Sequence, residues 1–221
     1  MNKNIPVIAI DGPSASGKGT VAQLVAQALG FNYLDSGALY RIVAFAAQQS
    51  GVDWNEAKAC GGLAQTLNIT FGQEQVFLDN IEISDQIRQE NIGTGASIVA
   101  QHLPVRNALL QLQHNMRLAP GLVADGRDMA SVVFPDATLK IFLTASVGMR
   151  AERRFKQYKN KGLPANFEQI YEDLKQRDYR DSERKNSPLM HTPDALLLDT
   201  TLRNIEEAVA FVLDAYQKIQ L

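Results

Sequence analysis

The sequence predicts a three-layer α/β domain in which helices cover both faces of a parallel sheet. Short apolar runs, each bounded by turn residues, alternate along the chain with longer segments whose apolar residues recur at helical spacing. The apolar runs are continuous, which is typical of parallel strands that are covered on both sides. This order of strands and helices implies right-handed crossovers between neighbouring strands.

The predicted elements can be placed in order along the chain. Strands are expected at residues 5–10, 31–34, 121–125, 139–144 and 195–199. Helices are expected at residues 17–29, 38–49, 104–117, 147–159 and 204–219. Gly30 ends the first helix, and Asn204 forms a capping box with Glu207 at the start of the last one.

Two segments interrupt this pattern and suggest how the chain is divided. Residues 67–83 alternate apolar and polar side chains between turns, which predicts a small antiparallel meander. Residues 156–189 are rich in charge and predict a short helical lid. We therefore expect a core of residues 1–62, 100–152 and 190–221, an insertion at 63–99 and a lid at 153–189.

Composition and charge disfavour several classes of protein. The chain has 22 Lys and Arg residues against 24 Asp and Glu residues, whereas a nucleic-acid-binding domain is usually basic. It has no run of about 18 apolar residues and no signal-peptide pattern, so we expect a cytoplasmic protein that does not span a membrane. We expect the single cysteine, Cys60, to be a buried structural residue, and the protein to be a monomer.

The strongest local signal is a glycine-rich segment between the first predicted strand and the first predicted helix. Glycines let the backbone curl so that its N–H groups point inward and bind an anion. The following helix N-terminus adds further N–H groups and a partial positive charge. The loop lysine can follow the β- and γ-phosphates of a nucleotide, and we expect it to face solvent beforehand. The predicted contacts are Gly12, Pro13, Ser14, Ala15, Ser16, Gly17, Lys18, Gly19 and Thr20.

One position departs from the common phosphate-loop pattern. Gly19 follows Lys18, where many such loops carry a Ser or Thr whose hydroxyl binds Mg²⁺. Thr20 is expected to contact phosphate, and no direct protein ligand for magnesium is predicted. Asp125 ends an apolar strand, and we expect it either to orient magnesium-bound water or to cap the next turn.

Arginines favour a kinase over other nucleotide-binding proteins. Transfer of a phosphoryl group between two phosphates brings several negative charges together. An arginine side chain can bind two phosphate oxygens at once. Arg41 and Arg127 follow predicted strands, and Arg106 lies early on a predicted helix.

The predicted helix within residues 166–185 carries a stripe that is apolar at its start and charged at its end. The stripe consists of Phe167, Ile170, Tyr171, Leu174, Arg177, Asp178, Asp181 and Arg184. The charged end fits a lid that brings arginines over the phosphate site. It fits equally a solvated helix face with internal Asp–Arg pairs.

Five blocks of residues together resemble the bacterial cytidylate kinases, a family of nucleoside monophosphate kinases. The blocks are residues 12–20, 34–41 (LDSGALYR), 124–129 (ADGRDM), 134–136 (FPD) and 177–184 (RDYRDSER). The resemblance covers essentially the whole chain. It implies transfer of a phosphoryl group from ATP to CMP or dCMP with Mg²⁺, and it implies that the meander belongs to a monophosphate-binding domain.

The resemblance also implies roles for individual residues. Those resembling residues around the cytosine are Ser36, Ser97, Arg106, Asp128 and Arg184, and those near the pentose are Arg177 and Asp181. Arg41 and Arg127 resemble acceptor-phosphate contacts, and Arg153 resembles a donor-phosphate contact. The expected catalytic set is Lys18, Arg127, Arg177 and Arg184. Asp128 can accept from the exocyclic amine of cytosine, whereas uracil would present a carbonyl to it.

Two other functions stay open at this point. A related kinase could phosphorylate UMP or AMP in place of CMP. A regulatory P-loop NTPase that reads guanine would normally carry an Asn-Lys-x-Asp element, and residues 160–163 (NKGL) lack the aspartate.

Overall fold

The computed structural model of the chain describes residues 5–72 and 75–220. Contacts between residues group the chain into two compact units. The first unit combines residues up to 34 with those from 116 onward, and the second is Asp35–Asn115. The first unit contains the glycine-rich loop, and the second contains the segment predicted as an antiparallel meander.

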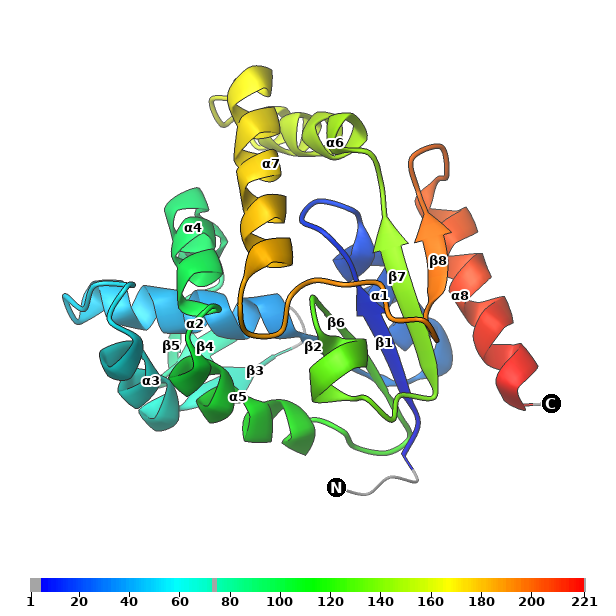
Figure 1. Cartoon of the computed structure of the whole chain (residues 1–221), viewed down its shortest axis with the longest axis horizontal. Coiled ribbons are helices and arrows are strands. Elements are labelled where there is room, and N and C mark those ends of the chain that lie inside the picture. The colour runs from blue at the N-terminus through cyan, green and yellow to red at the C-terminus, as the bar shows by residue number, and fades with distance from the viewer. Residues whose placement is uncertain (1–4, 73–74, 221) are drawn as a thin grey trace. The chain divides into compact units, whose positions relative to one another are not determined.

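A five-stranded sheet organises the first unit. The strand order is β2 (Asn32–Asp35), β6 (Leu122–Gly126), β1 (Val7–Asp11), β7 (Leu139–Thr144) and β8 (Leu196–Asp199). β1 pairs in parallel with β6 and with β7, and β7 pairs in parallel with β8 (Figure 1). The predicted parallel sheet is therefore confirmed. Its strands end at a common edge, where open α/β sheets bind ligands.

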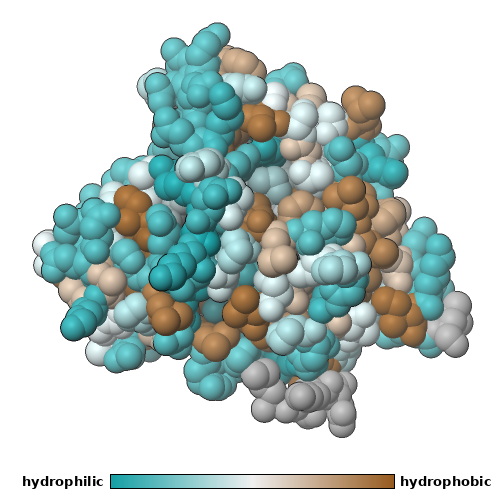
Figure 2. Space-filling view, viewed as in Figure 1, coloured by the Kyte–Doolittle hydropathy of each residue, from teal (hydrophilic) through white to brown (hydrophobic). Residues whose placement is uncertain are grey.

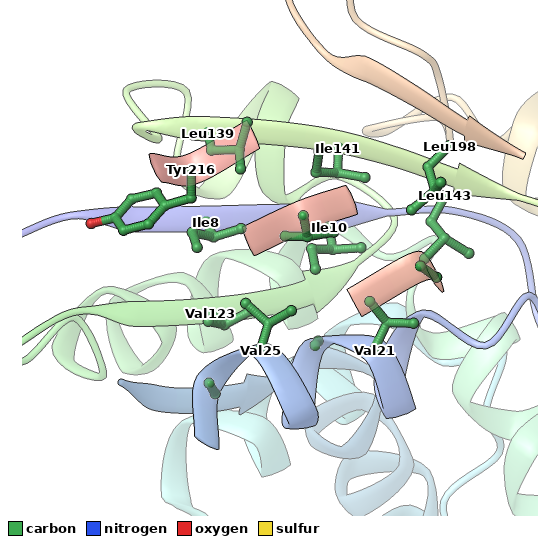
Figure 3. Close-up of a cluster of buried hydrophobic side chains, with 14 residues drawn as sticks. Ile8, Ile10, Val21, Val25, Val123, Leu139, Ile141, Leu143, Leu198 and Tyr216 are labelled. Atoms are coloured by element: carbon green, nitrogen blue, oxygen red, sulfur yellow. The ribbon is translucent and has the colours of Figure 1, made fainter. Parts of the chain in front are cut away.

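The sheet core explains why β1 reads as a continuous apolar run. Ile8 and Ile10 pack with side chains of α1 (Lys18–Leu29) and α8 (Ile205–Gln220) in one buried cluster (Figure 3). Val7 and Ala9, whose side chains point to the opposite face, are also fully buried. Because both faces of β1 are covered, its sequence shows no alternation.

The outer strand β8 differs from the prediction of a strand covered on both faces. Leu196 and Leu197 are 44% and 56% exposed, while Leu198 is 1% exposed. β8 stands at the edge of the sheet, so only one neighbouring strand shields it. Brown hydrophobic side chains are accordingly visible in the region of β8 in Figure 2.

The second unit contains the predicted antiparallel meander and four helices. The meander is formed by β3 (Ile69–Phe71), β4 (Val76–Leu78) and β5 (Ile81–Glu82), which pair antiparallel in that order. The helices are α2 (Ser36–Gln49), α3 (Ala57–Thr66), α4 (Glu90–Val99) and α5 (Leu103–Asn115), with a 3₁₀ turn at Gln86–Arg88. This unit thus joins the meander to helices that come before and after it in the sequence.

Helices α3 and α4 do not appear among the sequence predictions because glycines weaken their helical signal. Each contains two glycines, and glycine disfavours a helix interior by about 1 kcal/mol relative to alanine. Close packing explains two of them. A Cβ built on Gly61 would lie 2.5 Å from Pro104, and one on Gly95 would lie 2.5 Å from Trp54.

Two further helices of the first unit form a small subdomain with its own core. α6 (Val147–Asn160) and α7 (Phe167–Glu183) pack around Ala151, Ile170 and Leu174. The Asn166 side chain accepts from the Gln169 backbone N–H, as expected for a helix cap. The Gln169 side-chain amide donates to Asp173 and not back to Asn166. By contrast, Asn204 and Glu207 form their capping box in full.

The predicted division into core, insertion and lid concerns parts that move as bodies, and it stays a prediction.

Cys60 is free and fully buried, as predicted, and burial raises the pKa of its thiol. Among the described residues, no helix has the length and apolar character that crossing a membrane requires.

We predict that Ile141→Ala lowers the free energy of unfolding by about 2–5 kcal/mol. Ile141 is 0% exposed on β7, an inner strand of the sheet, so the truncation leaves a cavity in the sheet core. Leu202→Ala is the control because Leu202 is 95% exposed, and it should change stability by less than about 0.5 kcal/mol. Urea unfolding of both variants checks this. Equal losses would contradict the assignment of the core.

Candidate active site

The glycine-rich loop joins β1 to α1 and is held in a tight curl. A Cβ built on Gly12 would lie 1.9 Å from the Leu143 carbonyl oxygen, so only glycine fits there. Gly17 has a φ of 94° and stands at the N-cap of α1. Because Gly17 has no side chain to cap the helix, the first N–H groups of α1 are not occupied by a side-chain cap. The loop therefore has the backbone geometry of an anion site.

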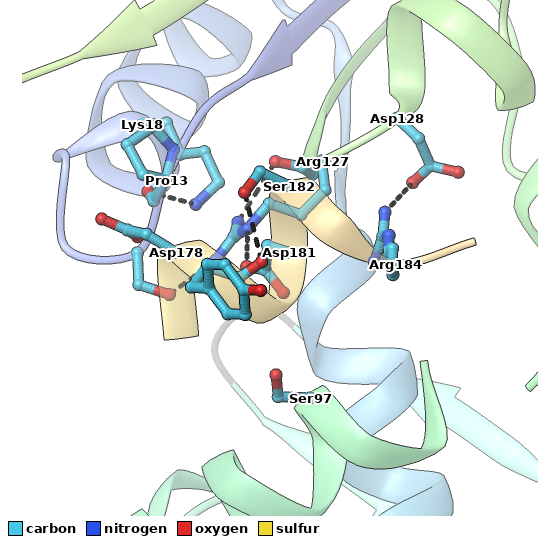
Figure 4. Close-up of polar contacts among 12 residues, drawn as sticks. Pro13, Lys18, Ser97, Arg127, Asp128, Asp178, Asp181, Ser182 and Arg184 are labelled. Carbon is cyan, nitrogen blue, oxygen red and sulfur yellow. Dashed lines mark hydrogen bonds and ion pairs between the residues drawn. The ribbon is translucent and has the colours of Figure 1, made fainter. Parts of the chain in front are cut away.

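Lys18 is buried in the loop, which contradicts the prediction that it faces solvent. Its residue exposure is 9%, and its Nζ donates to the Pro13 carbonyl at 3.3 Å (Figure 4). The curl that points backbone groups inward also folds over the lysine. Its ammonium group is thus held inside the loop rather than in bulk water.

Ser16 adds a second polar group to the loop interior. Ser16 is 1% exposed, and within the described residues its hydroxyl oxygen has no hydrogen-bond partner. A buried hydroxyl without a partner costs about 1–3 kcal/mol. A phosphate oxygen bound in the loop would satisfy it.

Arg153 ties the loop to the end of β8. Its Nη1 donates to the Ser16 carbonyl at 2.9 Å, and its Nη2 donates to the Thr200 carbonyl at 2.6 Å. The Thr200 hydroxyl donates in turn to the Ser16 carbonyl at 3.2 Å. The guanidinium group thereby closes one wall of a pocket that opens over the loop.

That pocket has a volume of about 620 Å³ and lies within the first unit. Its floor is the loop and the first turn of α1, and its walls come from α6 and from the start of α8. Besides Arg153, its wall residues include Gln157, Thr200, Arg203, Asn204 and Ile205. A volume of several hundred Å³ is typical of small-molecule sites.

The charged end of α7 is docked against the loop by two ion pairs. Arg127 Nε donates to Asp181 at 2.7 Å, and Arg150 Nη2 donates to Asp178 at 2.6 Å. These partners come from other elements, so the charged stripe is not a solvated face with only internal pairs. Figure 4 shows Asp181 of α7 turned toward Arg127.

Both arginines also hold Ser14. Arg127 Nη2 donates to the Ser14 hydroxyl at 2.7 Å, and Arg150 Nη1 donates to the Ser14 carbonyl at 3.1 Å. Ser14 therefore links the loop, the segment after β6 and α6. Through the aspartates, the same network reaches α7.

Charge pairing outweighs burial for both Arg127 and Asp181. Burial alone would lower the pKa of Arg127, but Asp181, with Asp125 and Asp178 nearby, raises it above its ordinary value. Burial alone would raise the pKa of Asp181, but Arg127 and two further arginines lower it. Both groups are thus charged at neutral pH.

Asp128 and Arg184 form a second buried pair in the first unit. The Arg184 Nη2 and Asp128 Oδ1 atoms are 3.7 Å apart, and both side chains are 3% exposed (Figure 4). Arg184 follows the last turn of α7, and Asp128 follows β6. Two of the five residues that were predicted to surround the cytosine therefore lie together.

Asp11 fixes the segment that carries Arg127 and Asp128. Its carboxylate accepts from the N–H groups of Met129 and Ala130 at 2.9 and 2.8 Å, at the start of a π-helical turn, η2 (Met129–Val133). Burial raises the pKa of Asp11 from 3.8 to about 6. The strand that enters the phosphate loop is thus bonded directly to the acceptor-side segment.

The carboxylate of Asp125 lies beside the first turn of α1. It is 4% exposed and accepts from the Tyr33 hydroxyl at 2.7 Å. A Cβ built on Gly19 would lie 3.9 Å from each carboxylate oxygen, so the group faces the loop rather than capping only the next turn.

These residues fit a magnesium ion that is bound through water. Among the described residues, no group of three or more His, Cys, Asp and Glu side chains could hold a metal directly. Mg²⁺ commonly keeps several waters and binds through a carboxylate and substrate phosphates. Asp125 supplies such a carboxylate next to the loop.

The second unit holds four of the predicted acceptor residues. Arg41 Nη1 donates to the carbonyls of Ile87 and Gln89, and Gly93 leaves room for its guanidinium group. Arg106 stacks over the Tyr40 ring at 5.7 Å. The remaining two, Ser36 and Ser97, are buried, and the Ser97 hydroxyl has no hydrogen-bond partner within the described residues. Ser97 is therefore ready for a ligand.

Several residues of the loop network were not among the predicted site residues. Arg150 and Asp178 are one turn from Arg153 and Asp181, and that spacing could have placed them on the same helix faces. Asp11 ends β1 directly before the loop, and this position could have identified it as a residue of the site. Thr200 and Tyr33 carried no local signal, because only the pairing of distant strands brings them to the loop.

The fold and the loop define a P-loop kinase: a parallel sheet whose central strand leads into a lysine-bearing glycine loop. A family model described as cytidylate kinase matches residues 8–218. A cytidylate kinase of Polynucleobacter asymbioticus is 55% identical, with 96% of this chain and 97% of that protein covered. A cytidylate kinase of Nitrosomonas eutropha is 53% identical, with 97% and 96% covered. The chain belongs to the cytidylate kinase family.

Similarity to solved structures is weaker. A shikimate kinase from Bacteroides thetaiotaomicron is 12% identical, covers 96% of this chain and 98% of its own, and has a TM-score of 0.48. That likeness is too low to bear on function.

We predict that Asp11 makes stability fall as pH rises. Because burial raises its pKa from 3.8 to about 6, its contribution is fully present below about 3.8 and is lost as pH rises through about 6. The loss is on the order of 3 kcal/mol. Urea unfolding between about pH 4 and about pH 7 gives the free energy of unfolding at each pH. This free energy should fall less with rising pH for Asp11→Asn than for the unchanged protein.

The control for this slope is Asp136→Asn, whose carboxylate is partly exposed and pairs with Arg117. In this variant the free energy of unfolding should depend on pH as it does in the unchanged protein. If Asp11→Asn showed that same pH dependence, Asp11 would not be its cause.

Proposed function

We propose that the protein transfers the γ-phosphoryl group of ATP to CMP or dCMP, giving ADP and CDP or dCDP. Membership of the cytidylate kinase family supports this reaction. The observation that carries the proposal is the contact of Arg127 with Ser14, at 2.7 Å. An arginine expected to bind the acceptor phosphate thereby touches the loop expected to bind the donor.

The donor is proposed to bind with its phosphates on residues 12–20 and its base in the adjoining pocket. The inward-facing lysine, the Ser16 hydroxyl and the first N–H groups of α1 suit three phosphates. Arg203, Asn204 and Ile205 border the same pocket and would surround the adenosine. Arg153, held between Ser16 and Thr200, would contact the donor phosphates from the side.

The acceptor is proposed to bind through the residues that resemble the acceptor contacts of the family. Arg41 and Arg127 would hold its phosphate, and Arg177 with Asp181 would hold the pentose. Ser36, Ser97, Arg106, Asp128 and Arg184 would surround the cytosine. Asp128 suits cytosine in particular, because a carboxylate accepts a hydrogen bond from the exocyclic amine.

Catalysis requires positioning and charge neutralisation rather than a general base. The attacking group is already an anionic phosphate oxygen, so no proton has to be removed from it. Lys18, Arg127, Arg177 and Arg184 would stabilise the charge on the transferring phosphoryl group. Arg127 would exchange its bond to Asp181 for a phosphate oxygen. When bound, Mg²⁺ would neutralise charge on the donor phosphates, and Asp125 would hold it through water.

We also propose that the protein acts as a cytoplasmic monomer. Its single cysteine is buried and free, so its stability does not depend on an intrachain disulfide. Size-exclusion chromatography with light scattering would test the oligomeric state.

The substrate assignment is tested by measuring ATP turnover with CMP, dCMP, UMP, AMP and GMP. The highest kcat/KM should be found with a cytosine nucleotide. UMP should be accepted less well, because a mismatched buried polar group costs about 1–3 kcal/mol. A preference for UMP, AMP or GMP would favour the related kinases, and GTP binding without acceptor-dependent turnover would favour a regulatory NTPase.

We predict that Lys18→Ala lowers kcat by at least about 100-fold while the protein stays folded. The ammonium group is held inside the loop, so its loss removes charge stabilisation at the donor phosphates. Lys175→Ala is the matched control because Lys175 lies on the exposed face of α7. Coupled assays and thermal melting check both variants. Near-normal turnover by Lys18→Ala would refute the role of the loop.

We predict that Asp128→Asn narrows the preference for CMP over UMP by about tenfold. Asparagine can donate to the uracil carbonyl, whereas the carboxylate cannot. The ratio of the two kcat/KM values is the measurement, and Asp194→Asn, at an exposed ion pair with Lys140, is the control. If the ratio stays unchanged, the base is read by other residues.

A further inference from the structure

The space beside Gly19 is bordered by two oxygen-bearing side chains. Gly19 lies in the first turn of α1, at the position where many phosphate loops carry a magnesium-binding hydroxyl. A Cβ built there would lie 3.6 Å from the Tyr33 hydroxyl oxygen and 3.9 Å from both carboxylate oxygens of Asp125. A side chain at this position would therefore point at these two groups.

Tyr33 and Asp125 reach this place from neighbouring strands, β2 and β6. The Tyr33 ring packs against the core cluster of the sheet, which fixes its direction. Its hydroxyl donates to Asp125 Oδ1 at 2.7 Å. The donated proton orients the carboxylate, and the tyrosine oxygen keeps lone pairs that can accept a hydrogen bond.

The chemistry of the space suits a metal-bound water. A water on Mg²⁺ is a strong hydrogen-bond donor, and the ion usually keeps several such waters. The Tyr33 and Asp125 oxygens are acceptors, and glycine leaves unfilled the space beside them that a Cβ at position 19 would occupy. A Ser or Thr hydroxyl at position 19 would fill that volume and bind the ion directly.

We infer that Tyr33 and Asp125 together replace the hydroxyl missing at Gly19 by accepting hydrogen bonds from a magnesium-bound water. Tyr33 is the positioning residue of the pair, since it holds the carboxylate of Asp125 at the loop. The inference rests on the proposed function only in that the ligand is a magnesium–nucleotide complex. It does not depend on which monophosphate is the acceptor.

A purely structural role of Tyr33 makes a different prediction. In that case its hydroxyl would only solvate a buried carboxylate that also lies near Arg127, whose pKa Asp125 helps to raise. Removing the hydroxyl would then lower stability, and it would weaken nucleotide binding equally with and without metal. Metal dependence of binding therefore separates the two roles.

The experiment compares binding of a fluorescent ATP analogue in excess Mg²⁺ and in EDTA, without any acceptor. Tyr33→Phe keeps the packed ring and removes only the hydroxyl. Its affinity should fall about tenfold in Mg²⁺ and stay unchanged in EDTA. Tyr171→Phe, on α7, is the control, and it should change neither affinity.

Gly19→Ala provides an independent second variant. Its Cβ would make ordinary van der Waals contacts and would favour the helix, so the protein should fold. It fills the space of the water, so it should show the same selective loss in Mg²⁺. Equal losses in Mg²⁺ and EDTA for Tyr33→Phe, or a loss in Tyr33→Phe that Gly19→Ala does not share, would overturn the inference.

These results stay distinct from the acceptor assay. Failure of cytosine nucleotides as substrates would leave the metal dependence of ATP binding measurable. A metal-independent defect in Tyr33→Phe would leave the cytidylate kinase assignment intact.

Discussion

The balance of buried charge around Ser14 holds the glycine-rich loop in place. Two arginines meet at this residue, one through the hydroxyl and one through the carbonyl. Their charges are matched by Asp181 and Asp178 of α7, because an unpaired arginine buried at this place would be costly. The loop, the segment after β6, α6 and α7 are therefore fixed by one network of ion pairs and hydrogen bonds.

Under the proposed function, the same network prepares a site for highly charged substrates. The aspartates neutralise the arginines, and the proposal has a phosphate take over Arg127 when it binds. Asp11 stabilises this arrangement by accepting hydrogen bonds from the backbone of η2, which follows Arg127 and Asp128. The end of β1, which leads into the glycine-rich loop, is thus bonded directly to the segment that carries Arg127 and Asp128.

Gly19 illustrates how one missing side chain changes what its surroundings must provide. Loops with a hydroxyl at this position can bind magnesium directly, whereas this chain places a carboxylate and a phenol beside the space that a Cβ would occupy. The strands that carry these two groups are neighbours in the sheet but are far apart in sequence. Their contribution is a property of the sheet order and not of the loop motif.

The sequence by itself determined the parallel sheet, the phosphate loop, the meander and the family, because these depend on local periodicity and on residues that lie close together along the chain. Tertiary structure decided the rest. It buried Lys18, left Leu196 and Leu197 of β8 exposed and formed the glycine-containing helices α3 and α4. It also paired the charged end of α7 with arginines from other elements. Such outcomes depend on contacts between residues that are far apart in the sequence, and local spacing does not predict those contacts.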